Sequence, residues 1–142
     1  MSESIPSRLH GQCHCGNLSF ELYWPDLEGS VPVRACGCDY CQKHGASWTS
    51  NPAGKVEFTV RSIDMRGIYE FGHRTARFQF CLQCGIPLAA ISTINDRDYA
   101  VVNANTFDNL GPLTLSGTPT DFSAEDEASR LARRAQNWTP VE

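Results

Sequence analysis

The chain has 142 residues, and its 12 basic and 16 acidic residues give a formal net charge of −4 at pH 7. A chain of this length buries roughly 70% of its unfolded surface, so we expect a single domain over residues 1–142 that needs no covalent cross-links. The few basic residues do not form the patch that phosphate backbones require, and no run reaches the roughly 18 apolar residues of a membrane span. We therefore expect no nucleic-acid partner and no membrane partner.

Short segments in which apolar and polar residues alternate run through most of the chain. Leu18, Phe20 and Leu22 alternate with polar neighbours, and similar or more continuous apolar runs recur downstream. The pattern predicts strands at 18–22, 31–33, 56–60, 68–71, 76–80, 88–91 and 99–102. Turn residues at 24–26, 51–54 and 95–96 separate them. The prediction is a mainly β fold, a sandwich or barrel of short strands, with its core at about 11–105.

One helix is predicted near the C-terminus, at about 123–137. Ser123 is a suitable N-cap, acidic residues fill the first turn, and basic residues end the helix: Arg130, Arg133 and Arg134. This polarity complements the helix dipole, and Asp126 and Arg130 have the spacing of an i,i+4 ion pair. We expect a solvated amphipathic helix without a binding role.

Seven cysteines occur in three clusters of two, three and two. Seven is an odd number, and the N-terminus has no apolar region of a secretory signal, so we expect the reducing cytoplasm, where clustered cysteines hold metals more often than they form disulfides. The clusters are Gly11-Gln-Cys13-His-Cys15-Gly16, Cys36-Gly-Cys38-Asp-Tyr-Cys41 and Cys81-Leu-Gln-Cys84-Gly85. Thiolates at such spacing suit zinc or an iron–sulfur cluster.

The seven ligands divide in two ways, and spacing alone allows both. In the first, which ligand counting favours, Cys13, Cys15, Cys81 and Cys84 close one structural zinc site, and Cys36, Cys38 and Cys41 form a second site with an open position. In the second, Cys38 and Cys41 join Cys81 and Cys84. An open position is typical of a catalytic zinc. A zinc with three thiolates should accept a small-molecule thiol and lower its pKa.

Several residues near the central cluster have more than one interpretation. His44 could be a fourth ligand, a nearby base or a surface residue, and His14 is expected to be exposed or to lie behind the ligands. Trp48 and Phe71 could wall a pocket, although core packing is the commoner role of large aromatics. Three arginines could bind a substrate carboxylate or lie on solvated strand faces: Arg66, Arg74 and Arg77.

From Gly11 to Asn105 the order and spacing of the cysteines resemble the family of glutathione-dependent formaldehyde-activating enzymes, which also contains centromere protein V. The resemblance implies an Mss4-like β-sandwich of short antiparallel strands with zinc knuckles, and two zinc ions per chain. It assigns Cys13, Cys15, Cys81 and Cys84 to a structural zinc, and Cys36, Cys38 and Cys41 to a catalytic zinc.

The activity that the resemblance implies is addition of glutathione, or another small thiol, to formaldehyde or a related aldehyde. The product would be S-(hydroxymethyl)glutathione, in the reverse of a carbon–sulfur lyase reaction. Two alternatives are a non-catalytic zinc module that binds a protein partner, and a protein that stores zinc or senses redox state through its three central cysteines.

Overall fold

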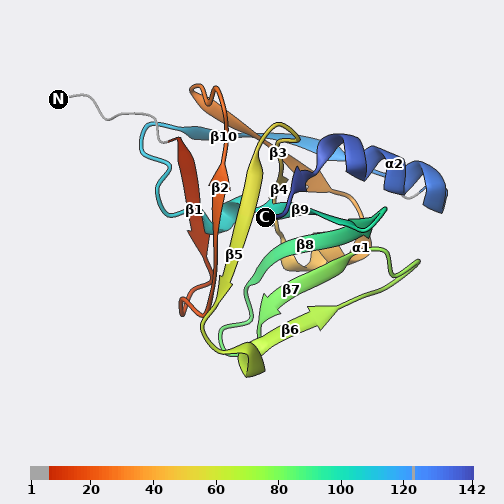
Figure 1. Cartoon of the computed structure of the whole chain (residues 1–142), viewed down its shortest axis with the longest axis horizontal. Helices are drawn as coiled ribbons and strands as arrows, with labels where there is room; N and C mark the ends of the chain where they lie inside the picture. The colour runs from red at the N-terminus through yellow and green to blue at the C-terminus, as the bar shows by residue number, and fades with distance from the viewer. Residues whose placement is uncertain (1–6, 123) are drawn as a thin grey trace.

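The computed structural model describes residues 7–122 and 124–142, which form two β-sheets and two α-helices (Figure 1). In chain order the strands are β1 (Arg8–Gln12), β2 (Leu18–Tyr23), β3 (Ser30–Cys36), β4 (Trp48–Thr49), β5 (Lys55–Val60), β6 (Arg66–Tyr69), β7 (Arg77–Cys81), β8 (Pro87–Ile94), β9 (Arg97–Asn103), β10 (Thr114–Thr120) and β11 (Thr139–Pro140). The helices are α1 (Asp39–His44) and α2 (Glu127–Asn137), with 3-10 turns η1 (Ile63–Met65) and η2 (Ala104–Thr106).

The smaller sheet has the strand order β1-β2-β5, and the larger has the order β10-β3-β4-β9-β8-β7-β6, with β11 paired to β9. Pairing is antiparallel except between β10 and β3, which run parallel from Thr114 opposite Ser30 to Thr120 opposite Cys36. Parallel neighbours need a long connection, and most of the chain lies between these two strands. The predicted mainly β fold is confirmed, with this parallel pair as an exception to the antiparallel expectation.

All seven predicted strands are present. In β2 the side chains of Leu18, Phe20 and Leu22 are buried whereas Glu21 is exposed, as the alternation predicted. The pattern missed the two-residue strands β4 and β11, and it also missed β1 and β10, whose sequences RLHGQ and TLSGTPT contain few apolar residues. β1 and β10 are edge strands, and pairing through the backbone needs little apolar sequence on an edge.

The two helices differ from the prediction. The short helix α1 inside the central cysteine cluster was missed. α2 begins at Glu127 with Asp126 as its N-cap, whose carboxylate accepts a hydrogen bond of 2.7 Å from the Ser129 N–H. The predicted cap, Ser123, lies outside the described residues. Because Asp126 caps the helix, Arg130 has Glu125 as its ion-pair partner, at 3.7 Å, instead of the expected Asp126.

The larger sheet is buried on both faces, which explains the continuous apolar runs in β8 and β9. Ala89 and Ile91 belong to the main core between the sheets, whereas Ala90 and Val101 belong to a second core on the opposite face. The main core also includes Leu9 and Leu113, outside the range 11–105. The second core contains Cys41, Trp48 and Trp138, so α1 and the end of α2 meet on that face.

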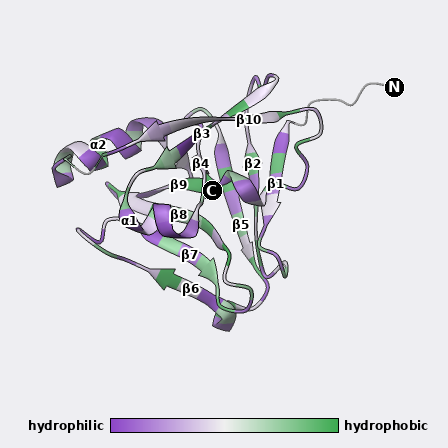
Figure 2. Ribbon diagram, turned by 180° about the vertical axis from the view of Figure 1, so that it is seen from behind, coloured by the Kyte–Doolittle hydropathy of each residue, from purple (hydrophilic) through white to green (hydrophobic). Residues whose placement is uncertain are grey.

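Residue hydropathy follows this arrangement (Figure 2). α2 carries mainly hydrophilic residues, while the strands beside it carry apolar ones. In the part of the chain that the structure describes, no helix has the length and apolar character needed to cross a bilayer.

Candidate metal centres and adjoining cavity

Four cysteines from two distant turns meet at the junction of the two sheets. The Sγ atoms of Cys13, Cys15, Cys81 and Cys84 all lie within 4.8 Å of one another, and we call this group the four-cysteine cluster. The Cys13–Cys15 sulfur distance is 3.8 Å and the Cys15–Cys81 distance is 3.5 Å. Sulfurs about 2.3 Å from one tetrahedral zinc are about 3.8 Å apart, so this set fits a zinc ion.

Each pair of these cysteines is carried by a turn that closes on a glycine. Gly16 has φ +83° and Gly85 has φ +80°, values that a residue without a Cβ adopts at little cost. Their N–H groups donate to the carbonyls of Cys13 and Cys81 at 3.1 and 2.8 Å. The turns between β1 and β2 and between β7 and β8 therefore hold both thiols of a pair on one side.

N–H groups point at the sulfurs of this cluster. The N–H groups of Leu18 and Cys84 donate to the Sγ atoms of Cys13 and Cys81 at 3.3 and 3.4 Å. Burial opposes ionisation of Cys84, but N–H groups of Cys15 and Ile86 lower its pKa to about 6. Donors of this kind stabilise thiolate, the form that binds metal.

The second set of sulfurs, which we call the three-cysteine cluster, comes from one short loop. Cys36 ends β3, Cys38 is the N-cap of α1, and Cys41 lies buried inside α1; their Sγ atoms also lie within 4.8 Å of one another. The Cys41 N–H donates to the Cys38 sulfur at 3.3 Å, and the Trp48 indole N–H donates to the Cys41 sulfur at 3.4 Å. Within the described residues, no His, Asp or Glu joins this group.

Two thiols of the three-cysteine cluster have pKa values shifted in opposite directions. A hydrogen bond from the Cys41 thiol lowers the pKa of Cys36 to about 5, although partial burial opposes this. The same hydrogen bond, together with burial, raises the pKa of Cys41. A soft set of three sulfurs that already favours one thiolate fits a zinc ion with one position left for another ligand.

The grouping of the sulfurs follows the first of the two divisions considered from sequence. Cys38 and Cys41 do not join Cys81 and Cys84. Spacing along the chain did not decide this, because the answer depends on which turns the sheets bring together.

Aromatic contacts position α1, and His44 takes part in these contacts instead of joining the possible metal ligands. Tyr40 contacts the rings of Phe78 and Phe71, with centroid distances of 4.7 and 5.3 Å. The His44 ring packs against Tyr40 at 4.4 Å, and its Nδ1 accepts the Ala46 N–H while its buried Nε2 has no partner. His44 is thus neither a surface residue nor part of the sulfur group. His14 is exposed, as expected.

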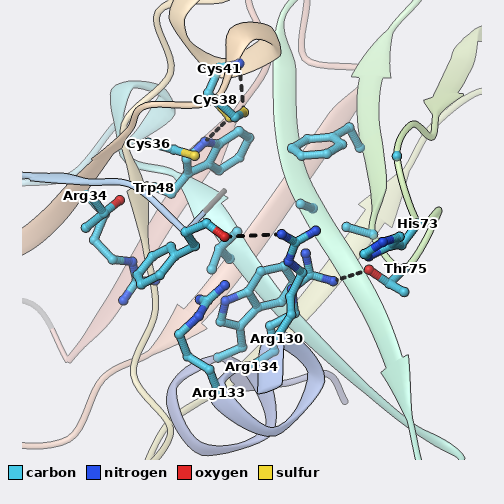
Figure 3. Close-up of a pocket in the computed structure, with 18 of the residues that line it drawn as sticks. Arg34, Cys36, Cys38, Cys41, Trp48, His73, Thr75, Arg130, Arg133 and Arg134 are labelled. Atoms are coloured by element: carbon cyan, nitrogen blue, oxygen red, sulfur yellow. Dashed lines mark hydrogen bonds between the residues drawn. The ribbon is translucent and has the colours of Figure 1, made fainter. Parts of the chain in front are cut away.

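A cavity of about 170 Å³ adjoins the three-cysteine cluster (Figure 3). Cys36, Cys38 and Cys41 lie at one end of it. Trp48 and Phe71 belong to its lining. Trp48 is also buried in the second core, so both of its sequence interpretations hold, whereas Phe71 is 38% exposed. The rest of the wall comes from β3, β7, β8, β9, the β6–β7 connection, β10 and α2.

Four arginines line the cavity away from the sulfurs: Arg34, Arg130, Arg133 and Arg134. The expected helix is solvated on its outer face only: three of these residues come from α2, and Arg134 is only 9% exposed. The sequence does indicate a shared arginine face, because Arg130, Arg133 and Arg134 occupy positions i, i+3 and i+4, which lie on one side of a helix. What sequence could not supply was the surface against which this face packs.

The arginines considered from sequence lie elsewhere. Arg66, Arg74 and Arg77 do not contribute to the lining of the cavity, and Arg77 on β7 is 3.8 Å from Asp98 on β9, across the intervening strand β8. Their alternative interpretation, residues on strand or turn surfaces, describes them better.

The fold and the two sulfur groups define a small, mainly β protein with cysteine sites suited to metal, one of them open to a cavity. A solved structure with the same fold is a crystal structure of a Rhodobacter sphaeroides protein, a Northeast Structural Genomics target. It matches with a TM-score of 0.54 and 28% identity over 75% of this chain and 99% of that chain. The chain belongs to the glutathione-dependent formaldehyde-activating enzyme family, whose model matches residues 8–122.

Proposed function

We propose that this protein is a zinc-dependent enzyme that adds glutathione, or another small thiol, to formaldehyde or a related aldehyde. The observation that carries the proposal is the cavity at the three-cysteine cluster, where three sulfurs converge beside space for a guest. Family membership supports the same reaction class. In this proposal Cys36, Cys38 and Cys41 hold a catalytic zinc, and the four-cysteine cluster holds a structural one, giving two per chain.

A zinc ion in the three-cysteine cluster would supply an electrophilic centre that lowers the pKa of a guest thiol. The protein contributes the surroundings. The Trp48 N–H donates to the Cys41 sulfur, and the rings of Trp48, Phe71 and Phe78 give the cavity an apolar wall. Proton and electron balance is simple: sulfur forms a bond to the carbonyl carbon, the C=O π pair moves to oxygen, and the proton lost by the thiol is matched by one gained at that oxygen.

The proposed compartment is the cytoplasm. Its glutathione pool would supply the thiol and keep the cysteines reduced. A purely structural zinc module or a redox sensor would need no cavity beside its sulfurs, and the lining of Trp48, Phe71 and arginines is better suited to a bound small molecule.

The test replaces zinc by cobalt and follows the thiolate-to-cobalt absorption while glutathione is added. We expect about two metal ions per chain by elemental analysis and a spectral change that saturates with glutathione. The Cys38→Ser variant should lose this change and lose formation of the formaldehyde adduct. It should keep a native circular dichroism spectrum, because Cys38 lies outside the four-cysteine cluster.

Absence of any spectral change at thiol concentrations of about 10 mM, in the range of a weak small-ligand complex, would contradict the proposal. A single metal ion per chain, retained in Cys38→Ser, would also contradict it, because the three-cysteine cluster would then hold none.

A further inference from the structure

The cavity has two chemically different ends. The three sulfurs occupy one end, and the arginine group (Arg34, Arg130, Arg133 and Arg134) occupies the other (Figure 3). Asp121 also belongs to the lining, and Glu125 lies beside two of the arginines. The four guanidinium groups outnumber these two carboxylates, so this part of the cavity has an excess of positive charge.

Two of the arginines are engaged by one carboxylate. Glu125 accepts two hydrogen bonds from Arg133, at 2.9 and 3.0 Å, and lies 3.7 Å from Arg130. Arg130 also donates to the carbonyl of Phe122 at 3.2 Å, and the Arg133 guanidinium stacks on the Phe122 ring at 3.7 Å. These contacts orient α2 and compensate part of its charge.

The other two arginines have hydroxyl groups as hydrogen-bond partners. Arg134 donates to the hydroxyls of Thr75 and Ser92 at 2.8 and 3.4 Å, and its buried Nε atom has no partner. Arg34 donates to the Ser50 hydroxyl at 2.6 Å. A guanidinium that is 9% exposed, with a donor left over, is costly to maintain unless an anion arrives beside it.

The charge of Arg134 is opposed by its surroundings. Burial and the nearby Arg133 and Arg130 lower the pKa of Arg134 to about 10. A carboxylate in the cavity would oppose this effect through charge-assisted hydrogen bonds.

We infer that the arginine group is a carboxylate-binding subsite, so that the thiol accepted at the three-cysteine cluster is an acidic one, with Arg34 and Arg134 as the residues that bind its carboxylate. This inference rests on the proposed function and adds the residues that bind the carboxylate and the discrimination against uncharged thiols. The thiol sulfur points to the cysteine end and the carboxylate to the arginine end, which also fixes the direction in which the guest lies.

Three of these arginines lie beyond the family match. The match ends at residue 122, whereas α2 begins at Glu127. Of the two residues that bind the carboxylate, Arg34 lies within the matched region and Arg134 lies in α2, so the subsite combines both parts of the chain.

The experiment compares 3-mercaptopropionate with its methyl ester, which has the same length but no charge. Binding of each to the cobalt-substituted full-length protein is followed by absorption, with 4-mercaptobutyrate and its ester as a longer pair. We expect the acid to bind about tenfold more tightly than the ester for at least one pair, the scale of one charge-assisted hydrogen bond. Arg34→Gln and Arg134→Gln should each remove most of this preference. Arg97→Gln, which removes an exposed arginine outside the cavity, should keep it.

The outcomes separate the two claims. Equal affinity for acid and ester in the unaltered protein overturns the carboxylate subsite but leaves thiol binding in place. Failure of every thiol to change the spectrum overturns the proposed function, and the subsite with it. A preference that persists in Arg34→Gln, a variant of a half-buried residue, overturns the assignment to this group even if Arg134→Gln does not fold.

Discussion

Hydrogen bonds to cysteine sulfur determine how firmly each cluster can hold a cation. In the four-cysteine cluster the donors are backbone N–H groups, which no side-chain substitution removes. In the three-cysteine cluster one donor is a side chain, the indole of Trp48, 3.4 Å from the Cys41 sulfur. The open cluster therefore depends on a residue that can be altered without changing a ligand.

Replacing Trp48 by phenylalanine should weaken metal retention in the three-cysteine cluster. The ring keeps its contacts with Phe78 and His44, whose centroids are 5.8 and 5.9 Å away, but the N–H donor is lost. We expect zinc bound in the three-cysteine cluster to be released to a chelator about tenfold faster, the usual effect of losing a group that orients a ligand. Stopped-flow zinc release with a chromogenic chelator measures this.

Trp24→Phe is the matched control, since Trp24 packs against the main core and does not line the cavity at the three-cysteine cluster. An unchanged release rate in Trp48→Phe would show that the indole N–H does not stabilise the cluster.

At the scale of elements, the surroundings of α2 differ from the solvated helix that the sequence predicted, because one face of α2 lines the cavity. Its sequence is that of a hydrophilic amphipathic helix, and periodicity alone placed it in solvent. In the structure, α2 forms one side of the cavity. Glu125, just before the N-cap of α2, forms ion pairs with Arg130 and Arg133 in the helix. The helix position therefore depends on this carboxylate as well as on packing of Trp138.

Replacing Glu125 by glutamine should destabilise the protein by about 1 kcal/mol at neutral pH, the upper end for a partly accessible ion pair. Hydrogen bonding from Arg133 lowers the pKa of Glu125 below its ordinary value of 4.5. A lowered folded pKa means that the stabilisation is fully present above the unfolded pKa and is lost as the pH falls through the folded pKa. The difference between the two proteins should therefore shrink below about pH 4.

Urea unfolding of both proteins across this pH range provides the measurement, and Glu57→Gln, an exposed change on β5, serves as control. A difference that is independent of pH would assign the effect to packing and not to charge.

At the scale of the whole molecule, the four-cysteine cluster connects the two sheets. Cys13 and Cys15 belong to the turn between β1 and β2 of the smaller sheet, while Cys81 and Cys84 belong to β7 and its turn in the larger sheet. A metal held there would join segments that are far apart in sequence, whereas the three-cysteine cluster closes only a short local loop. The two clusters therefore have different consequences for stability.

Cys84→Ser should lower the melting temperature by about 10 °C or more, corresponding to about 3 kcal/mol in a chain of this size. Cys38→Ser should shift it by only a few degrees, about 1 kcal/mol or less. Differential scanning calorimetry with and without a chelator measures both, and the chelator should reduce the gap between the Cys84 variant and the unaltered protein. Equal shifts in the two variants would contradict the division into structural and catalytic sites.

The sequence by itself determined the mainly β fold, the seven strands with apolar alternation and the residues available as metal ligands. These features are local, because a period of two and a Cys-x-x-Cys turn are decided by neighbours along the chain. It missed β1 and β10, which are edge strands with little apolar sequence, and α1, which is held by Tyr40 packing on residues of distant strands.

Only the tertiary structure decided which sulfurs meet, that His44 is packed between Tyr40 and Trp48, and that the arginine face of α2 turns toward the three-cysteine cluster. Each of these depends on the relative placement of segments far apart in the chain. That placement is set by burial of apolar surface over both faces of the larger sheet, and no spacing within a single segment encodes it.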